Sequence, residues 1–215
     1  MKKTMYSLLL DENVVRAVDQ LAHRQGCSRS ALVNRLLAEQ LGLMTPERRI
    51  GEVLQALDSL IRPDQELVPV FVPNALSMSM KSALDFKYRP TVKYEVELYR
   101  GGADAFGQLI VTFRTQSAEL LAAMDRFFAL WKRLEGKYLA ALPGYTAAYT
   151  PGSGKFLRAF AMPERDCGAD ELASAISEYV HLFDRLLKGY LSGRLSAADL
   201  ERQYASYTAA ADLLI

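Results

Sequence analysis

Cysteine and histidine are scarce in this chain of 215 residues, which contains two of each. Cys27 and Cys167 are too few and too far apart for a disulfide framework, which suits a reducing compartment. With His23 and His181 as the only histidines and no Cys-x-x-Cys pair, the sequence offers no zinc or nickel constellation. We therefore expect a protein that binds no metal ion and uses no cofactor.

Long apolar runs are lacking too. The stretch from Met5 to Leu10 ends at Asp11 after about six residues, which is short of the roughly 7–15 in a signal-peptide core. No stretch approaches the roughly 18 apolar residues of a membrane span. The sequence thus predicts a cytoplasmic protein with no membrane partner.

Motifs for catalysis are missing as well. The loop Gly152-Ser153-Gly154-Lys155 superficially matches the phosphate-binding motif GxxxxGK[ST]. The motif needs a glycine where Tyr149 stands and a serine or threonine where Phe156 stands, so the match fails. Neither histidine has a Ser or Cys nucleophile that the sequence places beside it. We expect no enzymatic activity.

What the chain does contain is typical of a globular protein. Half of its residues are apolar and 24% are charged, enough for one large or two small cores. The net charge is +1, but residues 1–50 carry eight Lys or Arg and five acids, a local charge of +3, and the remainder carries −2. A basic N-terminal part before a mildly acidic body suggests two functions in one chain.

The N-terminal part shows a strand, a helix, a turn and a second helix in that order. Residues 4–10 are a short extended candidate, and Asp11 or Asn13 can cap a first helix. Gly26 is predicted to end that helix, because glycine accepts the left-handed conformation at a helix C-terminus. Ser28 then supplies a side-chain acceptor for the first amides of the second helix.

One short strand and two helices bury too little apolar surface to be stable alone, so this unit needs a partner. The alternating stretch from Lys3 to Leu10, the segment from Leu21 to Gly26 and the capped start Ser28-Arg29-Ser30-Ala31-Leu32 resemble the ribbon-helix-helix superfamily of Arc- and MetJ-like repressors. The resemblance covers residues 1–44. It implies a homodimer whose two strands pair antiparallel and enter the major groove of double-stranded DNA.

The phase of the expected strand selects the side chains that face DNA. If Tyr6, Leu8 and Leu10 point toward the helices, the alternate residues point outward. The outward set departs from the family, because Met5 and Leu9 offer no hydrogen bond to a base edge. The expected base-facing residues are Lys3, Met5, Ser7 and Leu9, and the resemblance implies phosphate binding by Lys2, Ser28, Arg29 and Ser30.

The rest of the chain is predicted to form a connecting helix over residues 45–65 and an α+β domain over residues 66–215. The apolar stripe of the connecting helix can dock on the body or on the dimer mate, and the sequence leaves both open. Residues 67–72 form an edge strand at most, because prolines interrupt them. The other expected elements are a hairpin over 91–113, a strand over 156–162, helices over 117–141, 170–191 and 197–213, and a loop over 143–155.

Aromatic side chains are dense between residues 86 and 113, and sheet packing explains most of them. Tyr88 and Tyr99, which have arginine neighbours, are candidate contacts to a ligand or nucleic acid. If the body is a sensor, we expect a pocket between the hairpin and helix 117–141, with Tyr and Trp side chains at its edge.

Together these features predict an α+β protein in which a ribbon-helix-helix unit precedes an antiparallel sheet covered by long helices. The expected function is that of a homodimeric DNA-binding protein, first of all a transcriptional regulator, whose C-terminal domain senses a small-molecule or protein effector or forms oligomers. One alternative is an accessory DNA-binding factor of a plasmid or mobile element, in a relaxosome or partition system. Another is a protein interaction module that uses its N-terminal unit only to dimerise.

Overall fold

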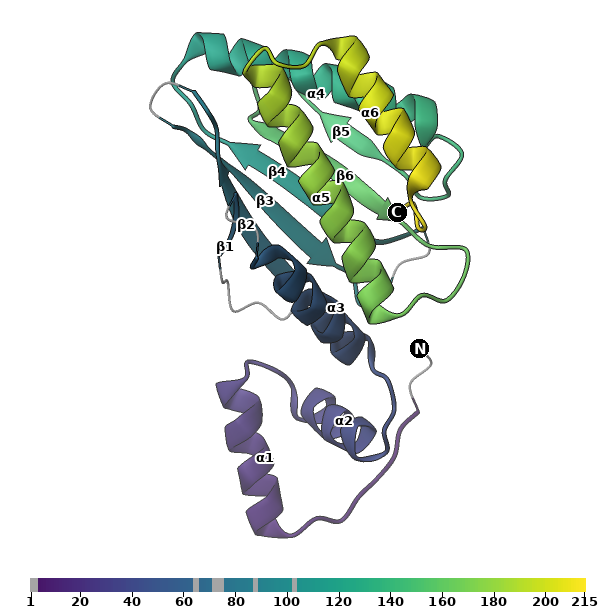
Figure 1. The fold of residues 1–215 in the computed structure, drawn as a ribbon. Helices are drawn as coiled ribbons and strands as arrows, with labels where there is room; N and C mark the ends of the chain where they lie inside the picture. Colours follow the sequence, from purple (N-terminus) through teal and green to yellow (C-terminus); the bar gives the residue numbers. More distant parts are fainter. Residues whose placement is uncertain (1–3, 64–65, 71–75, 87–88, 102–103) are drawn as a thin grey trace. The chain divides into compact units, whose positions relative to one another are not determined.

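The computed structural model describes residues 4–63, 66–70, 76–86, 89–101 and 104–215. The chain divides into two compact units, an N-terminal unit that ends at Thr45 and a C-terminal unit that begins at Pro46. As predicted, the fold is α+β, with N-terminal helices followed by an antiparallel sheet that is packed with long helices (Figure 1). The sheet has six strands.

The N-terminal unit contains two helices, α1 (Glu12–Arg24) and α2 (Arg29–Gln40). Gly26 has the expected left-handed backbone, with a φ of 60°, and the amide of Cys27 donates to the carbonyl of Ala22 at 3.0 Å. Ser28 caps α2, as its Oγ accepts from the amide of Ala31 at 3.2 Å. The predicted helix–glycine–helix turn is therefore confirmed. Asp11 occupies the N-cap position of α1, but its side chain makes no capping hydrogen bond.

The strand expected over residues 4–10 is not formed in this single chain. All seven residues are exposed. A strand needs a neighbouring strand for its amide and carbonyl groups, and the described residues of this unit supply only helices. Residues 4–10 thus have the alternating sequence pattern of a strand, but the described residues of their own unit offer no strand with which they could form hydrogen bonds.

The sheet of the C-terminal unit has the order β1-β2-β3-β4-β6-β5, and each pair of neighbours is antiparallel. The predicted hairpin of β3 and β4 is confirmed at its centre, and β1 is an edge strand as expected. Two strands, β2 and β5, were not predicted. The strands are β1 (Leu67–Val70), β2 (Ser77–Ala83), β3 (Thr91–Leu98), β4 (Ala105–Phe113), β5 (Ala147–Tyr149) and β6 (Lys155–Ala161).

Helices α3 (Pro46–Ile61), α4 (Ala118–Tyr138), α5 (Ala169–Leu191) and α6 (Ala197–Ala210) belong to the same unit. α3 packs along α5 and buries Leu57 and Ile61 completely (Figure 1). The helix expected over residues 45–65 is thus formed by Pro46–Ile61, and its apolar stripe docks on the body, which was one of the two possibilities that the sequence left open. α6 ends at Ala210, three residues before its predicted end.

An aromatic core joins the helices to the sheet. Phe183 of α5 lies 4.8 Å from Trp131 and 5.5 Å from Phe127, both of α4, measured between ring centroids. Phe128 stacks on Phe156 of β6 at 5.3 Å. Trp131 is fully buried among these rings, so its expected place at the edge of a ligand pocket is wrong. Burying these aromatic faces is what holds α4 and α5 on the sheet.

Candidate nucleic-acid interface

The start of α2 presents backbone amides to which the described residues supply no acceptor. Ser28 Oγ takes the amide of Ala31, and the amide of Leu32 donates to the carbonyl of Ser28 at 3.0 Å. The amides of Arg29 and Ser30 come before the first intrahelical bond and have no acceptor within the described part of the chain. These amides and the helix dipole attract an anion such as a phosphate.

Arg29 is already engaged within the unit. Its Nη2 donates to Asp19 Oδ2 on α1 at 2.6 Å, and its Nε approaches the other carboxylate oxygen. The side chain of Arg29 is 71% exposed, and a pair this open to solvent contributes only about 0–1 kcal/mol. A phosphate therefore has to compete with Asp19, but against a weak interaction.

The other arginines of the N-terminal unit differ in whether they have a side-chain partner. Arg16 pairs with Glu12 at 3.0 Å, and Arg35 donates to the side-chain oxygen of Gln25. Arg24, at the end of α1, has no ion-pair partner in the described ranges. The predicted phosphate-binding Lys2 and base-facing Lys3 lie outside the described residues.

The side chains of residues 5–10 differ in exposure in a partly alternating way. Met5 and Leu9 are 95% and 104% exposed, whereas Leu8 and Leu10 are 51% and 47% exposed. This difference agrees with the phase in which Leu8 and Leu10 face the helices, although Tyr6 is as open as the outward set. Contact of Met5, Ser7 and Leu9 with bases stays a prediction.

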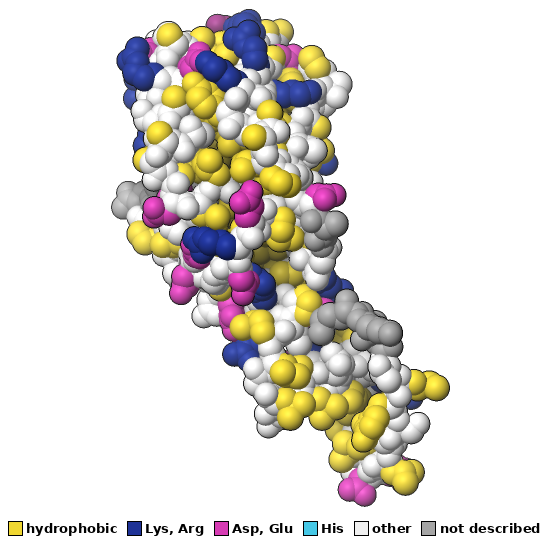
Figure 2. Space-filling model, turned by 90° about the vertical axis from the view of Figure 1, so that its right-hand side faces the viewer, with side chains coloured by type: hydrophobic (Ala, Val, Ile, Leu, Met, Phe, Trp, Pro, Cys, Tyr) yellow, Lys and Arg dark blue, Asp and Glu magenta, His cyan; other side chains and the backbone are white. Residues whose placement is uncertain are grey.

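Most apolar side chains of the N-terminal unit are uncovered. A hollow between α1 and α2 is lined by Leu21, Leu32 and Leu36, with Gln25, Arg35 and Glu39 around them. Figure 2 shows hydrophobic side chains gathered on the surface of this unit. Among its described residues, the buried side chains are Ala22, Leu32 and Ala38, and the exposed large apolar ones are Met5, Tyr6, Leu8, Leu9, Leu10, Val14, Val15, Leu36, Leu37, Leu41, Leu43 and Met44.

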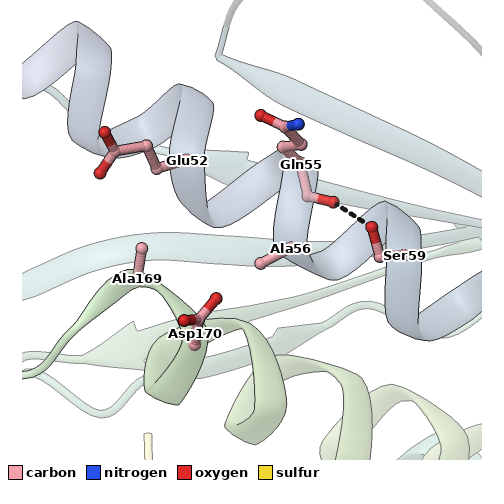
Figure 3. A pocket seen from close by; sticks show the side chains of 6 residues that line it. All are labelled: Glu52, Gln55, Ala56, Ser59, Ala169 and Asp170. Atoms are coloured by element: carbon pink, nitrogen blue, oxygen red, sulfur yellow. Dashed lines mark hydrogen bonds between the residues drawn. The ribbon is translucent and has the colours of Figure 1, made fainter.

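The C-terminal unit has a hollow of about 400 Å³ between α3 and the start of α5 (Figure 3). Its two carboxylates come from opposite sides, and Glu52 pairs with Arg48 at 2.9 Å. Ser59 Oγ donates to the carbonyl of Gln55 at 3.1 Å and is not poised as a nucleophile. The lining therefore contains two carboxylates and otherwise small or uncharged side chains, and it holds no catalytic pair. The lining residues are Glu52, Gln55, Ala56, Ser59, Ala169 and Asp170.

A charged cluster is buried deeper in the same unit. Arg158 of β6 donates from Nε to Glu135 Oε1 of α4 at 3.3 Å, and both side chains are essentially inaccessible. The hydroxyls of Tyr179 and Tyr204 donate to the same oxygen at 2.7 and 3.4 Å. Burial raises the pKa of Glu135, although Arg158 and these hydroxyls oppose the rise.

This cluster was not predicted, although the sequence contains a signal for it. Arg158 stands between Phe156 and Phe160 at alternating positions, so it shares the inward phase of its strand. Glu135 follows Trp131 by four residues on the apolar stripe of α4. A charge of each sign in an inward position predicts a buried pair, because neither charge is tolerated there alone.

The remaining candidates are ordinary surface or boundary residues. His23 is exposed on α1, as expected. His181 is half-buried on α5, with its Nδ1 2.7 Å from the carbonyl oxygen of Ser177. Tyr99 is 39% exposed, and Tyr88 lies outside the described residues. Among the described residues, His23, His181 and Tyr99 do not form a common site.

In the described ranges, no group of three or more His, Cys, Asp or Glu side chains is arranged to hold a metal ion. Of the helices that these residues form, none has the length and apolar character needed to cross a membrane. No protein-family model, no curated protein and no solved structure matches the chain.

Proposed function

We propose that the chain is a homodimeric DNA-binding protein of the ribbon-helix-helix type, with a C-terminal unit that serves regulation or oligomerisation. The observation that carries this proposal is the unfinished core of the N-terminal unit. Its described residues expose twelve large apolar side chains and bury only three apolar ones. Surface of this kind marks an interface, and a unit of 45 residues is too small to be stable without one.

A second copy supplies what the unit lacks. Residues 4–10 of the two copies pair as an antiparallel ribbon, which gives each strand its hydrogen-bond partners. The apolar hollow between α1 and α2 receives side chains from the partner. A two-stranded ribbon fits the major groove, and its outer face presents Lys3, Met5, Ser7 and Leu9 to the bases.

Phosphate contacts are expected to supply most of the affinity for DNA. Met5 and Leu9 can touch thymine methyl groups, but they forgo the roughly 1–3 kcal/mol of discrimination that a bidentate polar contact provides. Each subunit offers the free amides at the start of α2 together with Arg29 and Lys2 or Lys3. Two subunits thus neutralise roughly six phosphates.

The affinity for double-stranded DNA should therefore fall steeply with salt. With roughly six released counterions, we expect a loss of about a thousandfold between 50 and 200 mM salt, with little dependence on sequence. Fluorescence anisotropy with a labelled duplex measures this. If the intact dimer retains no duplex at about 50 mM salt, DNA binding is contradicted and the exposed Met5 and Leu9 favour the interaction-module alternative.

The double variant Ser28→Ala/Arg29→Ala should weaken binding to all duplexes by a similar factor, about tenfold or more, since it removes a helix cap and a phosphate contact. Ser7→Ala should instead change the preference among sequences with a smaller overall loss. Anisotropy titrations of several duplexes compare the two. Arg126→Ala, which removes an exposed cation from α4 in the other unit, serves as the control and should change neither quantity.

The variant Asp19→Asn should bind DNA several-fold more tightly than the wild type. The substitution frees Arg29 from its ion pair and removes a negative charge near the phosphate site. Glu12→Gln, at the first residue of α1, is the matched control, because it makes the same change of charge and frees Arg16 instead of Arg29 from its ion pair. Equal gains from both variants, measured at one salt concentration, would show that net charge rather than Arg29 is responsible.

A further inference from the structure

One face of α4 packs on the rest of the C-terminal unit, and the opposite face is exposed to solvent. The packed face contributes Phe127, Phe128 and Trp131 to the aromatic core. The exposed face contains side chains of two kinds, small and basic. Its small residues are Ala118, Ala122, Ala129 and Gly136.

The basic residues give this face a charge that the whole unit does not share. The C-terminal unit has 20 Lys or Arg and 21 Asp or Glu, whereas cations outnumber acids by four to one among the exposed residues of α4. Lys137 pairs with Glu201 of α6, but Arg126, Lys132 and Arg133 form no ion pair with any described residue. Figure 2 shows Lys and Arg side chains gathered at the top of this unit, the end where Figure 1 places α4. Such a surface attracts a partner that carries several negative charges.

The small residues form a row along the helix. With 3.6 residues per turn, Ala122, Ala129 and Gly136 lie within about 40° of one another around the helix axis. The cations border this row on both sides, with Arg126 and Arg133 on one side and Lys132 on the other. The row is therefore a shallow track between positive charges.

Gly136 is not explained by packing within the chain. Glycine destabilises a helix relative to alanine, and the usual reason to keep one is a neighbour that leaves no room for a Cβ atom. A Cβ atom built on Gly136 meets no described atom within 4 Å. Close approach of another molecule to this face accounts for a residue without a side chain.

We propose that the exposed face of α4 is a docking site for an acidic α-helix of a partner protein. Small residues spaced by two helical turns allow a second helix to lie close along the first. The cations that border the row then meet acidic side chains of the partner helix, which fixes its position and excludes partners of the opposite charge. The site lies in the C-terminal unit and does not depend on DNA binding.

A second copy of this chain does not suit the face. If two α4 helices pair through it, each brings the same basic borders, so that cations meet cations. A nucleic acid is also less suitable. Phosphate sites add hydroxyl, amide or main-chain donors to their cations, and α4 contains no Ser, Thr, Asn or Gln. The row of small residues has nothing to offer a phosphate, but it fits the backbone of a helix.

The experiment uses the full-length chain and labelled synthetic peptides. The acidic probe has three Ala-Glu-Ala-Ala-Ala-Glu-Leu repeats, in which the two glutamates of each repeat share one helix face. One matched peptide has Gln for every Glu. Another keeps the glutamates but has Pro for one Ala in each repeat, which prevents a helix. A labelled DNA duplex is the second kind of anion, and fluorescence anisotropy at one low salt concentration gives all affinities.

We expect the acidic helical peptide to bind at least tenfold more tightly than either matched peptide. Arg133→Glu should weaken its binding at least tenfold, and Ala129→Gln, which keeps every charge but fills the row, at least threefold. Lys81→Glu is the matched control, because it makes the same change of charge at an exposed position of β2. It alternates with the buried Met80, so it lies on the sheet face opposite the helices, and it should change the affinity less than twofold.

A reversal of charge separates lost contacts from lost folding. The same repeats with Lys for every Glu should bind Arg126→Glu/Arg133→Glu at least tenfold more tightly than the wild type. An unfolded variant gives no such gain, and a variant that folds without gaining affinity for the Lys peptide contradicts the docking site.

Several results would overturn the proposal. Equal affinity for the acidic helical peptide and either matched peptide, or no binding of it, excludes recognition of an acidic helix. An unchanged affinity in Ala129→Gln reduces the effect to general attraction of anions. If Arg133→Glu weakens duplex binding as strongly as peptide binding, the face binds nucleic acid instead, and if it dissociates an oligomer of the chain, the face binds a second copy. Failure of the wild type to bind any duplex contradicts only the proposed DNA binding.

Discussion

Replacing Leu8 with proline should separate the dimer and unfold residues 4–45 while the C-terminal unit keeps its structure. Proline removes an amide donor from the ribbon, and the symmetry of the dimer repeats the loss in the second copy. Without the ribbon the exposed apolar residues of α1 and α2 lose their cover. We expect the dimer dissociation constant to rise by about a hundredfold or more, or roughly 3 kcal/mol.

Sedimentation and hydrogen exchange measure this result. The amides of α1 and α2 should lose protection, while those of β3 and β4 keep it. The control is Leu8→Val, which retains the amide and suits a strand, and it should remain dimeric. A Leu8→Pro protein that stays dimeric with α1 and α2 fully protected would contradict a ribbon formed by residues 4–10.

Replacing Arg158 alone with methionine should destabilise the C-terminal unit by about 3–5 kcal/mol, because Glu135 is left buried without its cation. The double variant Glu135→Gln/Arg158→Met removes both charges and should recover most of the loss. Urea unfolding of the three proteins at pH 7 gives the free energies. If single and double variants are equally unstable, the ion pair is not the cause.

The loss in Arg158→Met should also depend on pH. Burial already raises the folded-state pKa of Glu135, and removing Arg158 removes an effect that lowers it. In the pH range between the unfolded and folded pKa values, the folded variant binds more protons than the unfolded one, so its stability falls as pH rises. The destabilisation should therefore shrink as the pH is lowered toward 4.5, the ordinary value for this carboxyl group. Arg114→Met, at an exposed position, should show neither effect.

The candidate DNA interface was predictable where it depends on neighbouring residues. Gly26 and Ser28 lie close together in the sequence, and the conformations they favour produce the turn and the cap without help from elsewhere. The ion pair of Arg29 with Asp19 was not predictable in the same way. It joins residues ten positions apart on different helices, and their distance depends on how α1 packs against α2.

The two unpredicted strands likewise depend on residues that are distant in the sequence. β2, with the sequence Ser-Met-Ser-Met-Lys-Ser-Ala, is poor in the residues that favour strands, yet it pairs with β3 along its whole length. β5 lies within a stretch rich in glycine and proline and pairs with β6 over three residues. Partners far along the chain, rather than intrinsic propensity, provide the hydrogen bonds that make these segments strands.

The sequence by itself determined the features that arise from periodicity and local hydrogen bonding: α1 and α2 with their turn, the hairpin of β3 and β4, and the long helices α4, α5 and α6. The tertiary structure alone decided that α3 packs on α5, that Glu135 meets Arg158, and that Ile215 reaches the same buried cation. Burial and ion pairing depend on which surfaces meet, and a linear pattern does not specify distances between remote segments. For residues 4–10 the proposed dimer extends the same reasoning to a second chain, since one copy contains the alternation of a strand and the described residues of its unit form only helices.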